Sequence, residues 1–390
     1  MAKFEYNFKN STYSKLWDSK EGQSLLVQIL NDPELIRSNF NFWRTKFQVD
    51  PAITPTGEDG TAVFKSELRE LGKSHLMDWR APLGDSYQEE KAGLSRYTGI
   101  IPDFIARGTV EKATEREYRE RKYRDAYGDD AALVLDYAKE IQVKVDSADQ
   151  TLSHLAAQLL STGQIVYNAG LGLKGGVYHV DTLPATNWRK AGEKTWSDPD
   201  CQLLTQMAAK EKEIRDELGT DAPFQWEIPY DVFHNIVLKN AEVKAWVASF
   251  RKVNELPWLE TGGVVTEKIF REAIAAYEGI SPIVIISEKQ RDVETMVSGW
   301  KANTVVFRPA GFAGLIRHTD SLDELMHKKY GATDITKVFS RGANGLYTIV
   351  NSTLNNGNYK EWHIDLFMSA VPSLDEFLYH FFIDITTADE

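Results

Sequence analysis

Apolar residues recur at every third or fourth position through the stretch from residue 129 to residue 163. The recurring positions are Leu133, Tyr137, Ile141, Val145, Ala148, Leu152, Leu155 and Leu159. Such spacing predicts a helix with one apolar stripe. The opposite face is expected to carry Asp136, Lys139, Glu140, Lys144 and Asp149. An aspartate at position 129 or 130 can cap the first amides, and Gly163 can end the helix. A helix of this length spans roughly 50 Å and should brace more than one subdomain.

The residues before this helix show no comparable period. Residues 22–30 predict one short helix, and the aromatic residues Phe40, Phe42, Trp43 and Phe47 then lie in polar surroundings. We interpret residues 1–50 as an arm rather than part of a core. Residues 51–110 are interrupted by glycine and proline throughout and predict only short extended runs. Connections in compact monomers are usually about four to six residues, so we expect something outside the subunit to cover this stretch.

The flanking and following segments predict a mixture of helices and strands. Residues 111–127 predict a strongly charged helix, whose charges are more often a solvated face than a binding surface. Further helices are expected at 199–218, ending at Gly219, within 228–250, and at 266–279. Strands are expected at 164–169 and 175–183, at 282–287 as a buried strand, and at 303–311, with a turn at 196–200. Residues 346–354 and 359–369 predict a hairpin around Asn356-Gly357.

Composition narrows the classes of function. The 390 residues are 42% hydrophobic, enough for about two or three domains with buried cores. A net charge of −12 argues against a nucleic-acid-binding surface, which needs clustered Lys and Arg. One cysteine, Cys201, allows neither an intramolecular disulfide nor a thiolate metal cluster. Residues 1–10 lack the apolar core of a signal peptide, and no apolar run is long enough to cross a bilayer, so we expect a soluble protein that is not classically secreted.

The chemical motifs do not favour an enzyme. Gly170, Gly172 and Gly175 have dinucleotide-binding spacing, but a strand-like segment follows where that fingerprint needs a helix, so we predict a glycine-rich hairpin. The eight histidines show no i, i+4 metal spacing. Glu361 with Asp365 is the one acidic pair considered as a general acid and base, and a nucleophile elbow and a P-loop are absent. We therefore predict no catalytic residue, cofactor or metal.

The order of parts resembles the major capsid proteins of tailed phages with the Hong Kong 97-type fold. Three segments carry the resemblance: LAAQLLSTGQIVY at 155–167, TWSDPDCQLLTQMAAKEKEI at 195–214 and WKANTVVFRPAGFAGLIRHT at 300–319. The first is similar to the end of the family's rod helix. The second is similar to the entry to the axial domain in the lambda-type branch, and the third to two axial-domain strands joined by a glycine turn.

This resemblance implies an α+β Hong Kong 97-like capsid fold built from five stretches of chain. These are an N-terminal arm at 1–53, an extended E-loop at 54–110, a peripheral (P) domain at 111–195 with the spine helix at 129–162, an axial (A) domain at 196–345, and the C-terminal strands of the peripheral domain at 346–390. The A domain would thus be inserted between the two parts of the P domain.

The resemblance further implies a major capsid protein that self-assembles as hexamers and pentamers into the icosahedral head shell of a tailed bacteriophage. Such a shell encloses double-stranded DNA without sequence-specific binding, is assembled in the host cytoplasm, and has portal, scaffolding and decoration proteins as further partners. No membrane is involved. The alternatives are an encapsulin-type nanocompartment shell, which shares the fold, and a soluble hydrolase.

The extended loop supplies the candidate contact residues between subunits. Apolar and bidentate side chains on such a loop need a partner surface, on a neighbour or on their own subunit. The residues selected on this ground are Trp79, Arg80, Tyr97, Ile101 and Phe104.

Overall fold

A computed structural model describes the backbone over the following residues: 41–52, 63–69, 94–106, 109–110, 130–167, 178–180, 187–219, 221–253, 264–277, 279–292, 295–320, 337–342, 346–356, 359–374 and 379–389. The helices predicted at 22–30 and 111–127 lie outside these residues. The chain divides into two compact units. Unit 1 comprises residues 1–64, 98–153 and 315–373, and unit 2 comprises residues 65–97, 154–314 and 374–390.

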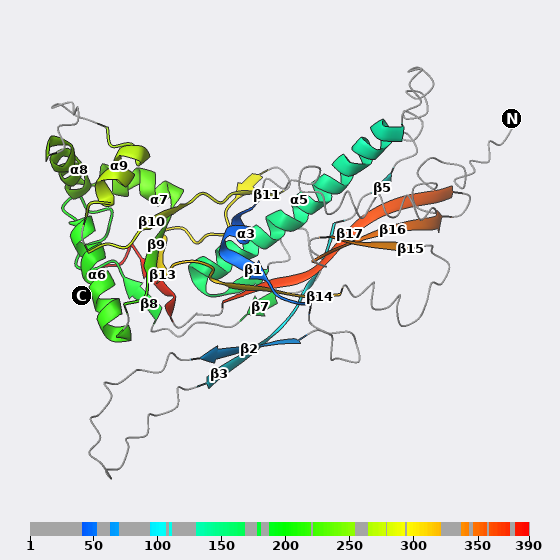
Figure 1. The fold of residues 1–390 in the computed structure, drawn as a ribbon, viewed down its shortest axis with the longest axis horizontal. Helices are drawn as coiled ribbons and strands as arrows, with labels where there is room; N and C mark the ends of the chain where they lie inside the picture. Colours follow the sequence, from blue (N-terminus) through cyan, green and yellow to red (C-terminus); the bar gives the residue numbers. More distant parts are fainter. Residues whose placement is uncertain are drawn as a thin grey trace, which may run out of the picture. The chain divides into compact units, whose positions relative to one another are not determined.

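Unit 1 is built on a seven-stranded sheet (Figure 1). Its main path runs β1 (Phe47–Val49), β14 (Gly314–Thr319), β17 (Tyr359–Leu374), β16 (Tyr347–Asn356) and β15 (Lys337–Gly342). The short strands β4 (Asp103–Ala106) and β5 (Thr109–Val110) also pair with β17, both antiparallel. The long strand β17 therefore pairs with four strands of this sheet, β14, β16, β4 and β5.

The predicted C-terminal hairpin is confirmed, with its turn shifted by one residue. Strands β16 and β17 pair antiparallel over nine registers, and the last register joins Asn356 to Tyr359. Two residues, Gly357 and Asn358, therefore separate the strands, where the sequence had suggested Asn356 and Gly357. A two-residue connection is the commonest hairpin loop because its backbone matches the twist of the strands that it joins.

The long helix α5 (Asp130–Thr162) is confirmed almost to the residue, and Gly163 follows it with φ +71°. The stripe positions whose side chains are described are buried, from Ile141 at 0% exposure to Ala148 at 5%. The assignment of the opposite face was wrong for Lys144 and Asp149, which are 9% and 0% exposed. Each of these two residues lies three or four positions from a stripe residue on both sides. Their side chains are therefore at the margin of the stripe rather than opposite it.

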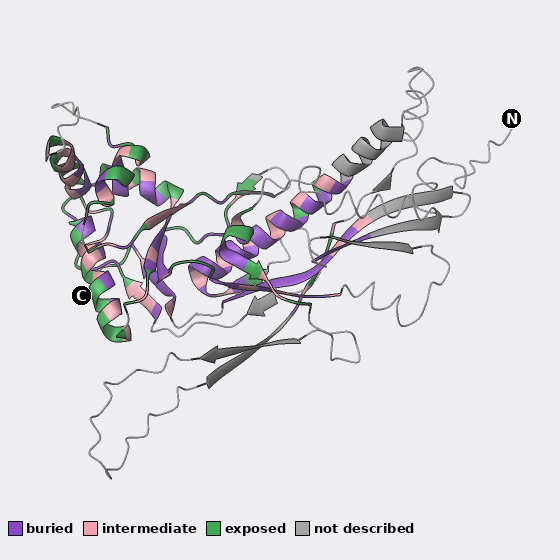
Figure 2. Cartoon of the chain, in the orientation of Figure 1, coloured by how far each residue is buried: buried purple, intermediate pink, exposed green. Residues whose placement is uncertain are grey.

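Unit 2 contains a five-stranded mixed sheet. The order is β10 (Ile283–Ile286), β9 (Phe224–Pro229), β13 (Thr304–Pro309), β18 (Phe381–Asp384) and β8 (Trp188–Lys190). The two outer pairs are parallel, and β13 is antiparallel to both neighbours. Strand β13 is buried along nearly all of its length (Figure 2), as its continuous apolar run predicts. The strand predicted as buried at 282–287 is instead the edge strand β10, most of which is half-buried.

Helices pack their apolar sides on one face of this sheet. They are α6 (Leu203–Leu218), α7 (Tyr230–Asn235), the short 3₁₀ helix η4 (Val237–Lys239), α8 (Ala241–Val253) and α9 (Glu267–Ile274). One core cluster contains residues from α6, α8 and α9 together with Trp226, Phe307 and Ile383 of the sheet. The predicted helices at 228–250 and 266–279 are thus confirmed. The helix predicted from 199 begins four residues later, and the turn before it is confirmed by the bond from the Asp200 amide to the Asp198 carboxylate.

The start of α6 is capped by a residue from another helix. Its own N-cap residue, Gln202, makes no side-chain cap. Glu242, in the first turn of α8, instead accepts the Leu204 amide at 2.7 Å, and its other oxygen accepts the Thr205 hydroxyl at 2.5 Å. A carboxylate at this position satisfies free amides and also complements the positive end of the helix dipole. Asn240 completes the joint, because its side chain donates to Cys201 O and accepts the Glu242 amide.

The other face of the sheet buries an ion pair. Arg308 of β13 donates to Glu227 of β9 at 2.8 Å, and the two side chains are 2% and 0% exposed. Arg308 also donates to the carbonyl oxygens of Pro309 and Gly311. His380, fully buried, lies 2.7 Å from Leu160 O, and burial lowers its pKa to about 4, so it is neutral at physiological pH.

Three two-stranded ladders complete the described backbone: β2 (Val63–Arg69) with β3 (Leu94–Ile100), β6 (Ile165–Tyr167) with β7 (Tyr178–Val180), and β11 (Gln290–Asp292) with β12 (Thr295–Val297). The antiparallel β6–β7 pair confirms the strands predicted on both sides of the glycine-rich stretch. Strands enclose that stretch, so a helix N-terminus does not follow it as the dinucleotide fingerprint requires.

We expect Glu242→Ala to lower the free energy of unfolding by about 1–2 kcal/mol, because the first amides of α6 lose their acceptor. Urea denaturation followed by circular dichroism measures this loss. The control is Glu272→Ala, an exposed glutamate of α9, which should change stability by less than about 0.5 kcal/mol. Equal effects of the two substitutions would contradict the capping role.

Candidate functional site

The described residues hold no arrangement typical of a catalytic or metal centre. They contain no group of three or more His, Cys, Asp or Glu side chains placed to hold a metal ion. Glu361 and Asp365 both lie on β17, four residues apart, which separates them by about 13 Å along the strand. They therefore do not form the acid and base pair that the sequence had raised. Across the described residues, each helix is too short or too polar to cross a bilayer.

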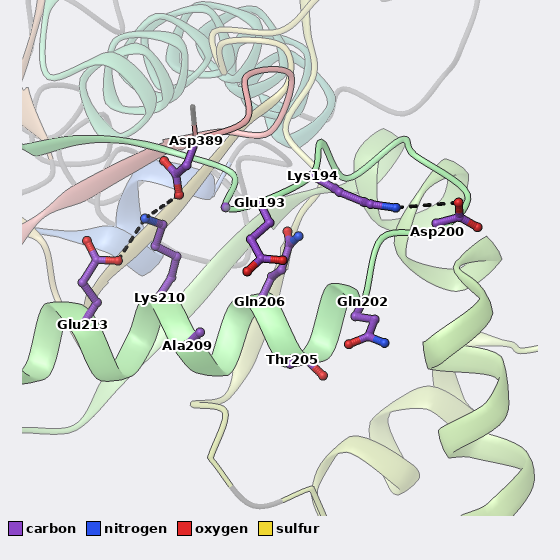
Figure 3. A pocket seen from close by; sticks show the side chains of 11 residues that line it. Glu193, Lys194, Asp200, Gln202, Thr205, Gln206, Ala209, Lys210, Glu213 and Asp389 are labelled. Atoms are coloured by element: carbon purple, nitrogen blue, oxygen red, sulfur yellow. Dashed lines mark hydrogen bonds and ion pairs between the residues drawn. The ribbon is translucent and has the colours of Figure 1, made fainter.

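A polar hollow of about 530 Å³ lies in unit 2 between the 192–202 segment, α6 and the C-terminal residues (Figure 3). Its lysines are engaged by acidic neighbours: Lys210 contacts Glu213 at 2.9 Å and Asp389 at 3.3 Å, and Lys194 contacts Asp200 at 3.6 Å. The one hydroxyl in the lining, that of Thr205, donates to Glu242. The hollow thus offers internally paired charges and no activated nucleophile.

The N-terminal segment from Phe42 to Asp50 is fixed within unit 1 by a buried charge. The short helix α3 (Phe42–Lys46) places Trp43, 1% exposed, so that its indole Nε1 donates to Asp149 of α5 at 2.9 Å. Arg44 donates to both oxygens of the same carboxylate at 3.3 Å, and the Tyr347 hydroxyl of β16 donates to it as well. Three donors from distant parts of the sequence therefore converge on one fully buried carboxylate.

This contact corrects the interpretation of the aromatic residues near position 45. They had been expected to belong to an arm and not to a core, yet Trp43 and Phe47 are 1% and 2% exposed. The physical reason is that Asp149 requires donors and the indole N–H supplies one. Among the aromatics named there, Phe40 lies outside the described residues. The sequence signal that could have located this site is a lone aspartate at the margin of an apolar helix stripe.

A second set of contacts holds the end of this segment. Strand β1 pairs with β14, and the Asp50 amide donates to Ile316 O at 3.1 Å. The Asp50 carboxylate forms an ion pair with Arg317, and the Asp50 carbonyl oxygen lies 2.7 Å from His318 Nε2. Arg317 also donates to Ser373 of β17 at 3.2 Å. The segment is thus attached at both of its ends, at α5 and at β14.

The root of the predicted extended loop is attached to the same sheet. Strand β4 pairs with Leu366 to Ser369 of β17, and the Ser369 hydroxyl donates to the Asp103 carboxylate. Strands β2 and β3 pair with each other in a sheet of two strands. A two-stranded ladder is at best marginally stable in water, which favours a further contact on its surface.

The predicted contact residues are distributed unevenly over the described structure. Trp79 and Arg80 lie outside the described residues, and only the backbone of Tyr97, on β3, is described. Ile101 is 5% exposed in the single chain, so little of its side chain is available to a neighbour. Phe104 is half-buried on β4, beside Ile105, which is 38% exposed and which the sequence reasoning had passed over.

Comparisons with known proteins identify the fold. No protein-family model matches the sequence, and no curated protein matches it either. Among solved structures, a protein assigned as the capsid protein of a prophage of Escherichia coli CFT073 superposes with a TM-score of 0.51 at 14% identity, covering 93% of this chain and 98% of its own.

Two phage capsids also match. The mature capsid of bacteriophage PhiM1 matches with a TM-score of 0.40 and 10% identity over 89% of this chain and 87% of its own. The capsid of Myoviridae phage XM1 matches with a TM-score of 0.39 and 11% identity over 89% and 92%.

The likeness to the prophage protein extends over nearly the full length of both chains. The α+β fold of the Hong Kong 97 capsid type, predicted from the order of parts, is therefore confirmed. The assignment to the lambda-type branch stays a prediction.

We expect Tyr347→Phe to lower the free energy of unfolding by about 1–2 kcal/mol, because it removes one donor from Asp149 and keeps the ring. Trp43→Phe removes the indole donor and also leaves a small cavity, so its loss should be larger, about 2–4 kcal/mol. The double variant should lose more than the sum, since Asp149 then retains only the half-exposed Arg44 as a donor among the three described here. Chemical denaturation measures all three losses.

Tyr230→Phe serves as the control, because Tyr230 is 44% exposed in unit 2 and should change stability by less than about 0.5 kcal/mol. Strict additivity of the two single losses would show that the donors act independently of one carboxylate.

Proposed function

We propose that this chain is the major capsid protein of a tailed bacteriophage, which assembles as hexamers and pentamers into an icosahedral head shell around double-stranded DNA. The observation that carries the proposal is the fold shared with the prophage capsid protein over 93% of this chain. The role is structural, with no catalytic residue and no cofactor. The shell forms in the host cytoplasm and becomes part of the virion.

The two attached roots support a role in assembly. The segment 42–50 and the strand β4 are fixed to the sheet of unit 1 by hydrogen bonds, ion pairs and strand pairing. Residues 1–41 come before the segment 42–50, and residues 54–100 lie between that segment and β4 in the sequence. Each stretch is therefore joined to the sheet of unit 1 at a fixed point. Under this proposal these stretches bind neighbouring copies, and head-to-tail contacts that close by rotation make rings.

The proposed division of the chain follows the capsid family. Residues 1–53 form the arm, 54–110 the E-loop, 111–195 and 346–390 the P domain, and 196–345 the A domain. Trp79, Arg80, Tyr97, Ile101 and Phe104 remain the proposed contact side chains, and Ile101 contributes the least, because it is 5% exposed in the single chain. Many modest contacts give a cooperative shell, because each buries area at about 25 cal/mol per Å² before association costs are subtracted.

The acidic character of the chain is compatible with a shell around DNA. A chain with a net charge of −12 does not bind DNA phosphate tightly. A shell wall made of such chains therefore does not impede packing of the genome. Portal, scaffolding and decoration proteins are the further partners that this role implies.

We expect the purified chain to elute from a size-exclusion column as hexamers or larger particles, and negative-stain microscopy to show rings or closed shells. A stable 44.2 kDa monomer at micromolar concentration would instead favour the soluble hydrolase. Particles recovered from the cells that naturally make this chain should protect double-stranded DNA from nuclease. A protein cargo in place of DNA would identify an encapsulin-type shell.

Deletion of residues 2–40 should abolish particles while leaving the circular dichroism of the chain mostly intact, because the attachment of Trp43 and Asp50 is retained. Deletion of residues 2–50 is the informative comparison, since it also removes the donors to Asp149 and should lower the unfolding midpoint. Shells formed by the shorter deletion would show that the arm is dispensable.

A further inference from the structure

The β11–β12 hairpin of unit 2 depends on its base for its position. Its strands pair with each other over three registers in a separate two-stranded sheet. Met296, on β12, is 60% exposed, so its side chain gives the hairpin little burial. Because an isolated two-stranded hairpin is marginally stable, the contacts at its base decide where it lies.

One carboxylate joins the two sides of that base. Glu288 precedes β11, and its Oε2 accepts the Ser298 hydroxyl at 3.0 Å and the Gly299 amide at 3.1 Å, both just after β12. The residue is 5% exposed, and its other oxygen, Oε1, is buried without a hydrogen-bond partner. The hairpin is therefore closed by neutral donors on one oxygen of a buried acid.

The segment after β12 is fitted closely to α5. A side chain at position 299 would overlap with the carbonyl oxygen of His154, so only glycine fits there. The Lys301 amide donates to the Ser161 hydroxyl at 2.8 Å, and the Trp300 indole donates to Thr304 O at 2.8 Å. Close packing at position 299 and these hydrogen bonds therefore hold the segment against α5.

The described side chains on the elements packed around Glu288 place no cation in contact with its carboxylate. Burial raises the pKa of Glu288 to about 7, and the hydrogen bonds from Ser298, Gly299 and Trp300 lower it only in part. Among the described residues on the packed elements, Lys289 is exposed, Lys301 Nζ lies 4.2 Å from the ring centroid of Trp188, and His154 Nε2 lies 3.2 Å from Gln158 Nε2. The ionised carboxylate is thus a buried charge supported only by neutral donors.

We propose that Glu288 is a proton-operated clamp: the neutral acid keeps the base of the β11–β12 hairpin closed on α5, and ionisation favours an open state in which the base is hydrated. A carboxyl pKa raised from 4.5 to about 7 means that the closed state binds the proton more tightly than the open one. The clamp is fully effective below pH 4.5 and is lost as the pH rises toward about 7. All the groups belong to one chain, so the inference does not rest on the proposed shell function.

Hydrogen–deuterium exchange with mass spectrometry on the full-length chain tests the clamp. For peptides that cover residues 290–300, exchange rates divided by the intrinsic rate at each pH should rise roughly 25-fold between about pH 5.5 and about pH 8. In Glu288→Gln, which keeps a neutral acceptor, the same ratio should stay constant. A wild-type ratio that does not change with pH, or a pH dependence that persists in the variant, overturns the proposal.

Two further variants keep the test decisive. Ser298→Ala removes a donor that favours the carboxylate, so the midpoint of the pH profile should move to higher pH. Glu272→Gln neutralises an exposed glutamate of α9 and should leave the wild-type profile unchanged. If Glu288→Gln does not fold, an unshifted midpoint in Ser298→Ala overturns the proposal on its own.

Discussion

The carboxylate of Asp149 is the constraint around which unit 1 is built. It sits on α5 with no exposure to water, and an ionised carboxylate in that position is very costly unless donors surround it. The donors come from Trp43, Arg44 and Tyr347, which lie more than a hundred positions away along the chain. Once α5 forms, the need of the Asp149 carboxylate for hydrogen-bond donors determines the positions of the N-terminal segment and of β16 next to the helix. Burial of the apolar stripe holds α5 in the core. The Asp149 carboxylate fixes which residues of the N-terminal segment and of β16 lie beside the helix.

Unit 2 uses buried carboxylates in the same way, with one exception. Glu211 of α6 accepts from Arg215, from the Trp226 indole and from the Ser281 amide, so its charge is both paired and solvated by donors. Glu227 is paired with Arg308 at 2.8 Å. The contacts of Glu211 and Glu227 each favour one side-chain geometry. That geometry does not depend on the protonation of solvent-exposed groups. Glu288 differs because its donors are neutral and one oxygen has none, which makes it the joint whose strength depends on a proton.

Sequence patterns correctly predicted those helices and strands whose structure depends mainly on residues close by in the sequence. The period of α5, the αL glycine after α6 and the apolar run of β13 each carry their information within a few residues. The errors fell where a distant partner decides. Lys144 and Asp149 were placed on the wrong face, and Trp43 and Phe47 were expected to lie outside a core, because the pattern cannot show a donor 106 residues away. The run at 282–287 was called buried, but apolar content alone does not distinguish an edge strand from a central one. The candidate contact side chains were chosen from their loop alone and stay a prediction, since the pattern could not show that Ile101 is 5% exposed in the single chain.

Under the proposed shell function, the attachment of both roots lowers the free-energy cost of assembly. Association loses translational and rotational freedom, and a segment that must also be ordered on binding adds a further cost for each side chain that it immobilises. Fixing Trp43 and Asp50 on one side, and β4 on the other, removes part of that cost before any neighbour arrives. Under the proposed shell function, a neighbouring copy then binds segments whose roots are already ordered, and the ordering cost of each contact is smaller. Under that proposal, fixed roots are suited to many weak, cooperative interfaces rather than to one tight one.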